Sequence, residues 1–189
     1  REVMQQHLQA CIKAGLMISG INAEVAPGQW EFQIGPVEGI DAADQLLLAR
    51  YLLERICENY TLLVNYQPKL IKGDWNGSGC HINFSTKNMR EGTEDKTGLE
   101  YIEEAIKNMA VNHIEDMKVY GEDNDKRLTG NNETSSYDTF THGKANRGAS
   151  VRIGNKTYKN KKGYFEDRRP ASNINPYQAT STLLKTVMV

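Results

Sequence analysis

The chain has 189 residues, enough for one domain with a substantial core and little more. Its 23 basic residues against 24 acidic residues leave a formal net charge of -1. This balance excludes the broad basic field of a nucleic-acid-binding surface and the charge excess of a disordered chain. The partners must therefore be inferred from individual sites.

Cysteine content and the length of apolar runs indicate the cellular compartment in which the protein is expected. Cys11, Cys57 and Cys80 are far apart and form no CxxC motif, which fits a reducing compartment better than a disulfide framework. No apolar run approaches the roughly 20 residues of a membrane span, and the N-terminus lacks the layout of a signal peptide. We therefore expect a cytoplasmic protein with no membrane or nucleic-acid partner, and an organellar form stays open.

The N-terminal residues already follow a helical pattern. Apolar side chains recur at helical spacing over residues 3–17, and Gly15 and Gly20 mark the exit. Arg1 opens the chain without an initiator methionine or a capping signal before the helix. We therefore expect the chain to be part of a longer protein.

Residues 22–36 predict two strands joined by a Pro-Gly turn. Apolar and polar residues alternate from Trp30 to Ile34, the pattern of a sheet with one buried face, so Glu31 is expected to point away from the apolar layer. Glu24 alternates in the same way, and the turn could bring both carboxylates together. Two carboxylates facing one cavity repel unless a cation lies between them, so the pair is a candidate metal site, although most strand glutamates are only solvated.

Residues 80–86 predict another half-buried strand, whose polar side carries His81. The glycine-rich residues 76–79 before it let the backbone approach a ligand. His81 is either a hydrogen-bonded residue at a sheet edge or a metal ligand. The other elements predicted are a helix capped by Asp41, a strand over residues 62–64, a helix over 99–117, a loop over 121–141, a strand over 146–153, a solvated lysine-rich turn over 156–162, an extended run over 164–170, and a closing helix capped by Asn175 with Pro176 in its first turn.

Possible metal ligands and several arginines lie on the polar faces of these elements. Oxygen ligands with one imidazole suit Mg²⁺ or Mn²⁺ better than zinc, and the arginine fork binds phosphate at two points. Together they predict metal-assisted phosphoryl transfer, without a GxxxxGK[ST] or GxGxxG loop. The alternative is that the arginines form ordinary surface ion pairs. The residues concerned are Glu24, Glu31, His81 and Glu166, with Arg127, Arg147, Arg152 and Arg168.

Five long motifs carry a specific resemblance along nearly the whole chain. NAEVAPGQWEFQIGP, GDWNGSGCHINFSTKNMR, RLTG followed by ET, ANRGASVRIG and GYFEDRRPASNINPY resemble glutamine synthetase of the eukaryotic type. The resemblance implies an α+β fold, a curved antiparallel sheet with helices packed on its outer face. It also implies that residues 1–189 are a partial catalytic domain, without the family's N-terminal β-grasp domain and a strand with two further metal-binding glutamates.

The family's reaction implies ATP-dependent ligation of ammonia to L-glutamate through γ-glutamyl phosphate, with Mg²⁺ or Mn²⁺, in nitrogen assimilation or ammonia detoxification. By resemblance, Glu24 and Glu31 are ligands of the glutamate-side metal, and His81 and Glu166 of the nucleotide-side metal. The positions that resemble substrate ligands are Trp75, Asn76, Gly77, Arg127, Arg147 and Arg168. Those that resemble the nucleotide site are Asn83, Phe84, Ser85, Tyr164, Arg147 and Arg152, with Glu31 and Glu166 through the metals. The residues implied to be catalytic are Glu133, on a flap, with Arg147 and Arg168.

Two positions depart from the family pattern: Asn132 stands where histidine is usual, and Lys126 where arginine often precedes Arg127. Neither departure removes a residue implied to bind a ligand, and any effect is expected on the mobility of the flap. The family also forms homo-oligomers of stacked rings, decamers by resemblance, in which a neighbour completes each active site. We therefore expect residues 1–189 alone to show no turnover in a γ-glutamyl hydroxamate assay. The alternatives are a truncated, non-catalytic assembly or regulatory protein, or a ligase for another amine.

Overall fold

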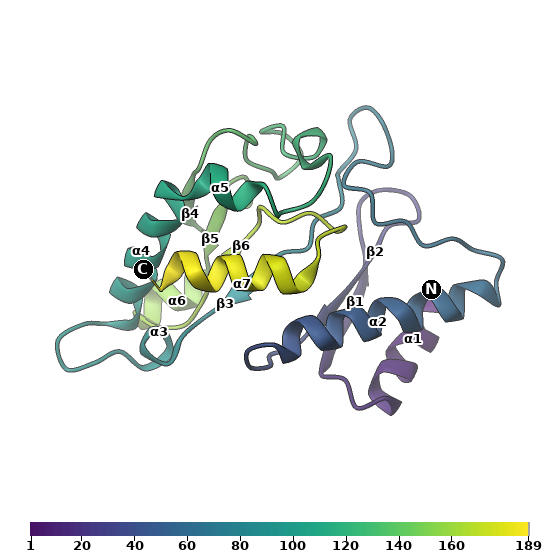
Figure 1. Ribbon diagram of the computed structural model, residues 1–189, viewed down its shortest axis with the longest axis horizontal. Helices are drawn as coiled ribbons and strands as arrows, with labels where there is room; N and C mark the ends of the chain where they lie inside the picture. Colours follow the sequence, from purple (N-terminus) through teal and green to yellow (C-terminus); the bar gives the residue numbers. More distant parts are fainter. Residues whose placement is uncertain (189) are drawn as a thin grey trace. The chain divides into compact units, whose positions relative to one another are not determined.

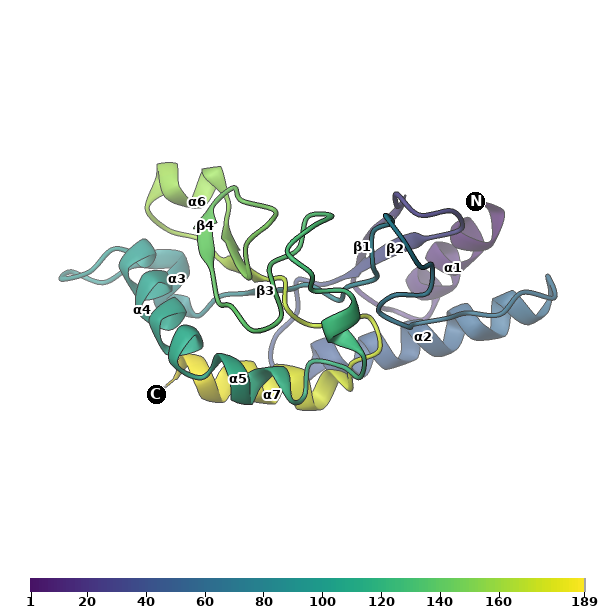
Figure 2. The same ribbon diagram turned by 90° about the horizontal axis from the view of Figure 1, so that it is seen from above.

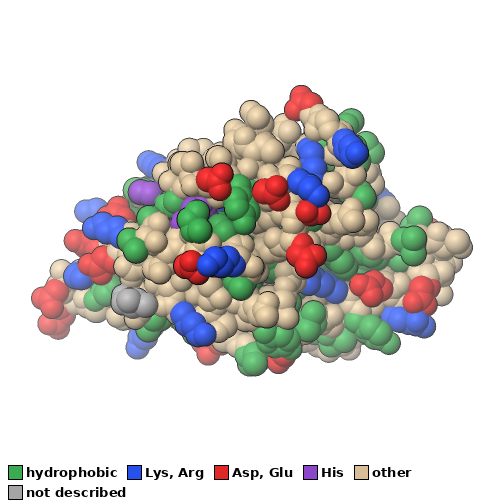
Figure 3. All heavy atoms as spheres, turned by 45° about the horizontal axis from the view of Figure 1, so that its top comes forward, with side chains coloured by type: hydrophobic (Ala, Val, Ile, Leu, Met, Phe, Trp, Pro, Cys, Tyr) green, Lys and Arg blue, Asp and Glu red, His purple; other side chains and the backbone are tan. Residues whose placement is uncertain are grey.

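The computed structural model describes residues 1–188 and divides the chain into two compact units, Arg1–Tyr66 and Gln67–Val189. Both units combine helices with short strands (Figure 1), which confirms the predicted α+β class. None of the helices in the described part of the chain is both long and apolar enough to cross a membrane. On the face drawn in Figure 3, acidic and basic side chains are interspersed, as the near-zero net charge leads one to expect.

The first unit is built from two helices and a two-stranded antiparallel sheet. Met4 on the first helix and Leu53 and Cys57 on the second form its buried core. Trp30 and Phe32 pack against that core from the second strand, and the residue between them is exposed. This alternation confirms the sheet predicted from the sequence. The elements are α1 (Glu2–Lys13), β1 (Ile18–Ala23), β2 (Trp30–Ile34) and α2 (Asp41–Glu58).

The second unit contains a four-stranded sheet in the order β3-β6-β5-β4. The β3–β6 and β6–β5 pairs are antiparallel, whereas β5 and β4 are parallel. The prediction of a wholly antiparallel sheet is therefore wrong at the β4 edge. After Lys144 the chain returns to the end of the sheet at which β4 begins, and Ala145 is in the left-handed region at φ 51°. The strands are β3 (Ile82–Phe84), β4 (His142–Lys144), β5 (Val151–Ile153) and β6 (Phe165–Asp167).

Helices of the second unit pack on this sheet through a shared apolar core. Ile106 of α4 and Leu183 of α7 are buried with Val151, Ile153 and Phe165 of the central strands. Figure 2 shows α5 and α7 side by side, with β4 and α6 on the other side of the unit. The helical elements are α3 (Lys87–Glu91), α4 (Gly98–Val111), α5 (His113–Met117), the 3-10 turn η1 (Asn124–Lys126), α6 (Asn155–Asn160) and α7 (Pro176–Val187).

Two of these helices begin at capping residues that the sequence makes recognisable. The Thr97 side chain accepts from the Glu100 amide, and the Glu100 carboxylate accepts from the Thr97 amide at 2.8 Å, a reciprocal capping box. Asn175 accepts from the Tyr177 amide at 3.0 Å with Pro176 at the first helical position, which confirms the predicted start of α7.

Several predicted boundaries are wrong in the first unit. Helix α1 ends at Lys13 rather than near residue 17, because Gly15 takes a φ of 78° that an α-helix cannot continue. Asp41 is the first residue of α2 rather than its cap; the capping position is Ile40, without a side-chain bond. Residues 62–64 form no strand, since no neighbouring strand pairs with them and Leu63 is 99% exposed.

In the second unit, asparagines interrupt two predicted elements, and a third element is helical where a turn was predicted. The helix over residues 99–117 divides at Asn112, whose side chain donates to the Asn108 carbonyl at 2.9 Å. The strand over 146–153 is limited to β5, because Asn146 accepts from the Gly148 amide at 2.9 Å and forms a turn. The lysine-rich residues 156–162 are largely helical in α6, which starts at Asn155.

A buried polar network ties β6 to the helices. Arg169 is fully buried and donates to both carboxylate oxygens of Asp167, at 2.9 and 2.8 Å, and to Asp116 at 3.1 Å. The Tyr120 hydroxyl donates to Asp167 at 3.0 Å, and the Thr186 hydroxyl of α7 donates to Asp116 of α5 at 2.7 Å. The network fixes the strand that carries Glu166.

His7 is a buried histidine in the first unit. Its Nε2 atom lies 2.9 Å from the Ala49 carbonyl oxygen and 3.3 Å from Cys11 Sγ. Its Nδ1 atom is buried without a hydrogen-bond partner among the described residues. Burial lowers the pKa of His7, against the raising effect of the Ala49 carbonyl. The folded unit therefore holds this imidazole neutral.

The lowered pKa of His7 predicts a loss of stability in acid. Below the unfolded-state pKa of about 6.5, the unfolded chain binds a proton that the folded chain does not, so the free energy of unfolding falls as the pH falls; above it this contribution is complete. Urea unfolding between about pH 7.5 and 5.5, followed by Trp30 fluorescence in a Trp75→Phe background, measures the effect. His7→Gln should flatten the pH dependence, and an unchanged slope would contradict the assignment.

Candidate functional site

Glu24 and Glu31 form a carboxylate pair in the first unit. The pairing of Asn22 with Glu31 puts Glu31 on the same side as Glu24, two residues beyond Asn22. Burial, a hydrogen bond with Glu31 and the charge of Glu31 raise the pKa of Glu24. Asn22 donates to Glu24 at 2.9 Å, and Gln33 donates to Glu31. The structure thus confirms that the turn brings the two acids together.

Glu166 is the centre of a charged cluster in the second unit. Its Oε1 atom lies 3.2 Å from His81 Nδ1 and 3.0 Å from Arg168 Nη1, and its Oε2 atom lies 2.5 Å from Arg152 Nε. Sheet register causes this meeting, because Glu166 on β6 is opposite both Asn83 on β3 and Arg152 on β5. Burial acts to raise the pKa of Glu166, but the hydrogen bond from His81, the charge that this imidazole carries in acid, and the two arginines lower it to about 2.

The pKa of His81 is lowered in this cluster, where its side chain is 33% exposed. Desolvation lowers its pKa, the Glu166 hydrogen bond opposes that effect, and the charges of Arg168 and Arg127 lower the pKa further. Its Nε2 atom faces Gly79, where a β-carbon would lie 2.9 Å away. A neutral imidazole beside an ionised carboxylate is suited to act as a metal ligand, which is one of the two roles predicted for His81.

Arg168 links Glu166 to the predicted flap. It is 8% exposed and donates to the Glu133 carbonyl at 3.1 Å, while its Nε atom is buried without a hydrogen-bond partner among residues 1–188. Arg147 reaches the Glu133 carboxylate at 3.2 Å, with both side chains more than half exposed. An orphaned guanidinium nitrogen in a buried site is a donor for an anion.

Arg127 is buried beneath the predicted substrate segment. Its guanidinium donates to Asn124 at 3.0 Å and to the carbonyls of Arg168, Arg169 and Pro170, at 3.1, 2.6 and 3.2 Å. These partners are all neutral, and burial lowers the pKa of Arg127 to about 10. Its positive charge therefore has no carboxylate partner within ion-pair distance in the described chain.

Gly77 packs directly on Arg127. A β-carbon at Gly77 would lie 2.4 Å from Arg127 Cγ and 2.5 Å from the Pro68 carbonyl oxygen, closer than any real contact. The glycine is therefore required for the backbone to lie on the arginine stem. The approach of this backbone to a ligand stays a prediction, since the close partner of Gly77 in the structure is a side chain of the same unit.

The predicted nucleotide residues lie around the same sheet. Asn83 and Tyr164 are exposed, and the Ser85 hydroxyl accepts from Arg90 at 3.0 Å. The Phe84 ring lies 5.6 Å from Phe165 and packs on the core, so this side chain is largely committed to packing.

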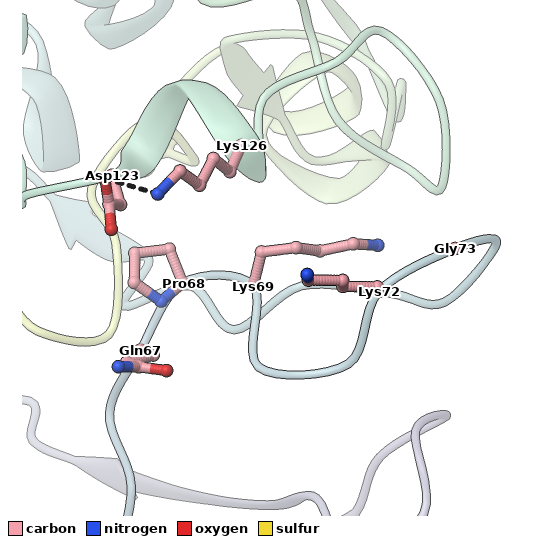
Figure 4. Close-up of a pocket in the computed structure, with 7 residues that line it drawn as sticks. All are labelled: Gln67, Pro68, Lys69, Lys72, Gly73, Asp123 and Lys126. Atoms are coloured by element: carbon pink, nitrogen blue, oxygen red, sulfur yellow. Dashed lines mark ion pairs between the residues drawn. The ribbon is translucent and has the colours of Figure 1, made fainter.

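A cavity of about 540 Å³ lies beside the predicted substrate segment (Figure 4). Lys69 and Lys72 extend along it, and Lys126 pairs with Asp123 at 2.8 Å. The residues predicted to bind ligand do not line it, so the charged cluster around Glu166, rather than this cavity, is the candidate site. The lining residues are Gln67, Pro68, Lys69, Lys72, Gly73, Asp123 and Lys126.

Sequence reasoning missed Asn124 and the contact of Asn132. Asn124 is buried and donates to the Tyr120 and Arg169 carbonyls while accepting from Arg127. Asn132 donates to the Trp75 carbonyl at 3.3 Å. Both residues lie in a stretch of loop composition, where no periodicity distinguishes a buried or bonded side chain from a solvated one.

The donors for a metal fall into two pairs, one in each unit. Among residues 1–188, no three acidic, histidine or cysteine side chains gather closely enough to hold a metal ion together. Each pair, Glu24 with Glu31 and His81 with Glu166, offers two donors to an ion. The oxygen-rich donor set, with the raised pKa of Glu24, fits Mg²⁺ or Mn²⁺.

The fold and site define a class: an α+β protein with a carboxylate pair and an arginine-rich charged centre on short strands. The chain matches the family model described as "Glutamine synthetase, catalytic domain" over residues 1–189. It therefore belongs to the glutamine synthetase catalytic-domain family.

Relatives support the same assignment. A protein of Acanthamoeba polyphaga mimivirus is 59% identical over 187 residues, which are 99% of this chain and 52% of that protein. The glutamine synthetase of Saccharomyces cerevisiae is 54% identical over 99% of this chain and 50% of its own length. The cytosolic isozyme 1-3 of Arabidopsis thaliana glutamine synthetase is 54% identical over the whole chain and 52% of its own length. The chain thus spans about half the length of these curated relatives.

Proposed function

We propose that the chain is the catalytic part of a glutamate–ammonia ligase, which forms L-glutamine from L-glutamate, ammonia and ATP. The observation that carries the proposal is the cluster in which Glu166 meets His81, Arg152 and Arg168. Membership of the glutamine synthetase family supports the reaction. Nitrogen assimilation or ammonia detoxification in the cytoplasm is the corresponding role.

The proposed chemistry has two steps. An oxygen of the glutamate γ-carboxylate attacks the γ-phosphorus of ATP, the bond to the bridging oxygen breaks, and ADP leaves. Ammonia then attacks the acyl carbon of γ-glutamyl phosphate, and phosphate leaves with its electron pair. Arg147, Arg152 and Arg168 neutralise charge on the transferred phosphoryl group, and preorganised charges of this kind lower a barrier because they need no rearrangement.

Glu133 takes a proton from ammonium in this scheme. Its carboxylate is exposed beside Arg147, and its backbone carbonyl is bonded to Arg168. A carboxylate can both attract ammonium and accept its proton once water is excluded. The buried cation of Arg127, with its neutral partners, supports binding of the substrate carboxylate in the region of Trp75, Asn76 and Gly77.

Mg²⁺ or Mn²⁺, when bound, supplies further neutralisation of charge between ATP and glutamate. Glu24 and Glu31 would hold the glutamate-side ion, and His81 and Glu166 the nucleotide-side ion. Asn83, Phe84, Ser85 and Tyr164 would bind the adenine nucleotide, with Arg152 on its phosphates. A homo-oligomer of stacked rings, a decamer by resemblance, is the proposed assembly.

The proposed reaction is tested by supplying the protein, at its natural full length, with ATP, glutamate and either ammonium or methylamine. Amide formation with ammonium, matched by phosphate release, supports the proposal. A preference for methylamine would assign another amine as acceptor. Folded protein that forms neither product would support the non-catalytic alternative.

Binding of a divalent cation to the carboxylate pair gives a prediction independent of turnover. The raised pKa of Glu24 means that ionising the pair costs stability as the pH rises through that pKa, and a cation between the carboxylates removes this cost. Mn²⁺ at about 100 times its Kd should stabilise the folded protein by about 2.7 kcal/mol, measured as a rise in Tm at neutral pH.

The Mn²⁺ effect has a matched control. Glu24→Gln should reduce the rise in Tm, whereas Glu38→Gln, an exposed residue after β2, should leave it unchanged. An equal rise in wild type and Glu24→Gln would show that the ion binds elsewhere.

A further inference from the structure

Residues 130–135 form a closed turn that carries Glu133. Thr129 and Ser136 pair as an isolated β-bridge, and the Gly130 amide donates to the Ser135 carbonyl at 3.2 Å. Inside the turn, Asn132 and Glu133 both have left-handed backbones, with φ of 50° and 61°. Asparagine tolerates this region better than other non-glycine residues, whereas glutamate adopts it with strain. Something must therefore hold the turn in this shape.

Several side-chain contacts to other segments hold this turn: the Ser150 hydroxyl donates to the Ser135 hydroxyl at 3.0 Å, the Thr134 hydroxyl donates to the Arg127 carbonyl at 3.2 Å, and two further bonds lie at the left-handed residues. Arg168, from the end of β6, donates to the Glu133 carbonyl at 3.1 Å. Asn132 donates to the carbonyl of Trp75, 57 residues earlier in the chain, at 3.3 Å. The contact from Arg147 to the Glu133 carboxylate joins two exposed side chains, and exposed ion pairs contribute little.

Asn132 thus combines two properties at one position. Its backbone accepts the left-handed conformation, and its side-chain amide fastens the turn to the segment that precedes Asn76 and Gly77. Alanine would lose both properties, glycine would keep only the backbone, and aspartate would keep the shape without a donor for a carbonyl.

We propose that Asn132 is a positioning residue, which fastens the turn of residues 130–135 to the Trp75 carbonyl and so sets the place of the Glu133 carboxylate. Its catalytic consequence rests on the proposed function, because Glu133 is the group that would take the proton from ammonium. The fastening itself is a property of the fold and is measurable without turnover.

The fastening is tested by hydrogen exchange of the Gly130 and Thr134 amides, which donate within the turn. In Asn132→Gly and Asn132→Asp these amides should exchange about fivefold to tenfold faster than in wild type, the effect of losing one hydrogen bond. Asn131→Ala is the matched control, since the neighbouring Asn131 contributes only backbone groups to the contacts described. It should exchange as wild type does. Wild-type exchange in both Asn132 variants would overturn the proposal.

A kinetic split separates positioning from a general loss of structure. In the two Asn132 variants, kcat/KM for ammonium should fall about tenfold, whereas ATP- and glutamate-dependent formation of the acyl phosphate should be unchanged. An equal fall in both would overturn the positioning role. If the wild-type protein forms no glutamine, the proposed function fails, and the exchange measurement still decides whether Asn132 fastens the turn.

Discussion

Replacing Arg169 with methionine should lower the free energy of unfolding by about 3–5 kcal/mol, because it leaves two buried carboxylates without their cation. Asp167 and Asp116 are respectively 0% and 1% exposed, and both receive hydrogen bonds from the Arg169 guanidinium. The ring of Tyr120 also lies 5.0 Å from the Arg169 guanidinium carbon. Urea unfolding of the two proteins at neutral pH measures the difference.

The matched control for this prediction is an arginine in an exposed ion pair. Arg55 contacts Glu58 at 2.7 Å with both side chains more than half exposed, so Arg55→Met should cost less than about 1 kcal/mol. Equal losses for Arg169→Met and Arg55→Met would show that the buried network does not stabilise the fold. Because Asp167 is on β6 beside Glu166, the Arg169 variant should also disturb the charged cluster.

Replacing Glu166 with glutamine should reduce glutamine formation by about 100-fold or more. The glutamine would leave two arginines without their carboxylate partner, and its neutral amide would replace a carboxylate as a metal ligand. The carboxylate has a pKa of about 2, so the wild-type residue is ionised throughout the neutral range. The loss should therefore be nearly independent of pH between about 6 and 8. Steady-state rates with saturating ATP and glutamate give the comparison.

Glu103→Gln provides the control for Glu166→Gln. Glu103 is an exposed residue of α4, so its replacement changes the net charge equally without touching the cluster. Glu103→Gln should keep wild-type activity. Wild-type activity in Glu166→Gln would remove the cluster from the proposed mechanism.

Local patterns predicted the elements whose signals lie close together in the chain. The alternation around Glu31 identified β2, the Asn175-Pro176 pair identified the start of α7, and the turn between β1 and β2 correctly brought Glu24 to Glu31. Each depends on neighbours within a few residues, for which periodicity and capping chemistry suffice.

Contacts between distant segments could not be predicted from such patterns. His81 and Glu166 meet because β3 pairs with β6, and this pairing leaves no trace in the periodicity of either strand. The bond from Asn132 to Trp75 and the burial of Arg169 are of the same kind. The family resemblance indicated which residues belong to the site, whereas the contacts of each side chain came from the structure.

Transfer of oxygen from substrate to product phosphate tests the central claim most directly. Glutamate labelled with ¹⁸O in its γ-carboxylate should yield phosphate that carries one labelled oxygen, because that oxygen forms the bond to the γ-phosphorus and leaves with it when ammonia attacks. The mass of the phosphate released with glutamine by the full-length protein reports the transfer. The account predicts one labelled oxygen per phosphate, and unlabelled phosphate formed together with glutamine would contradict it.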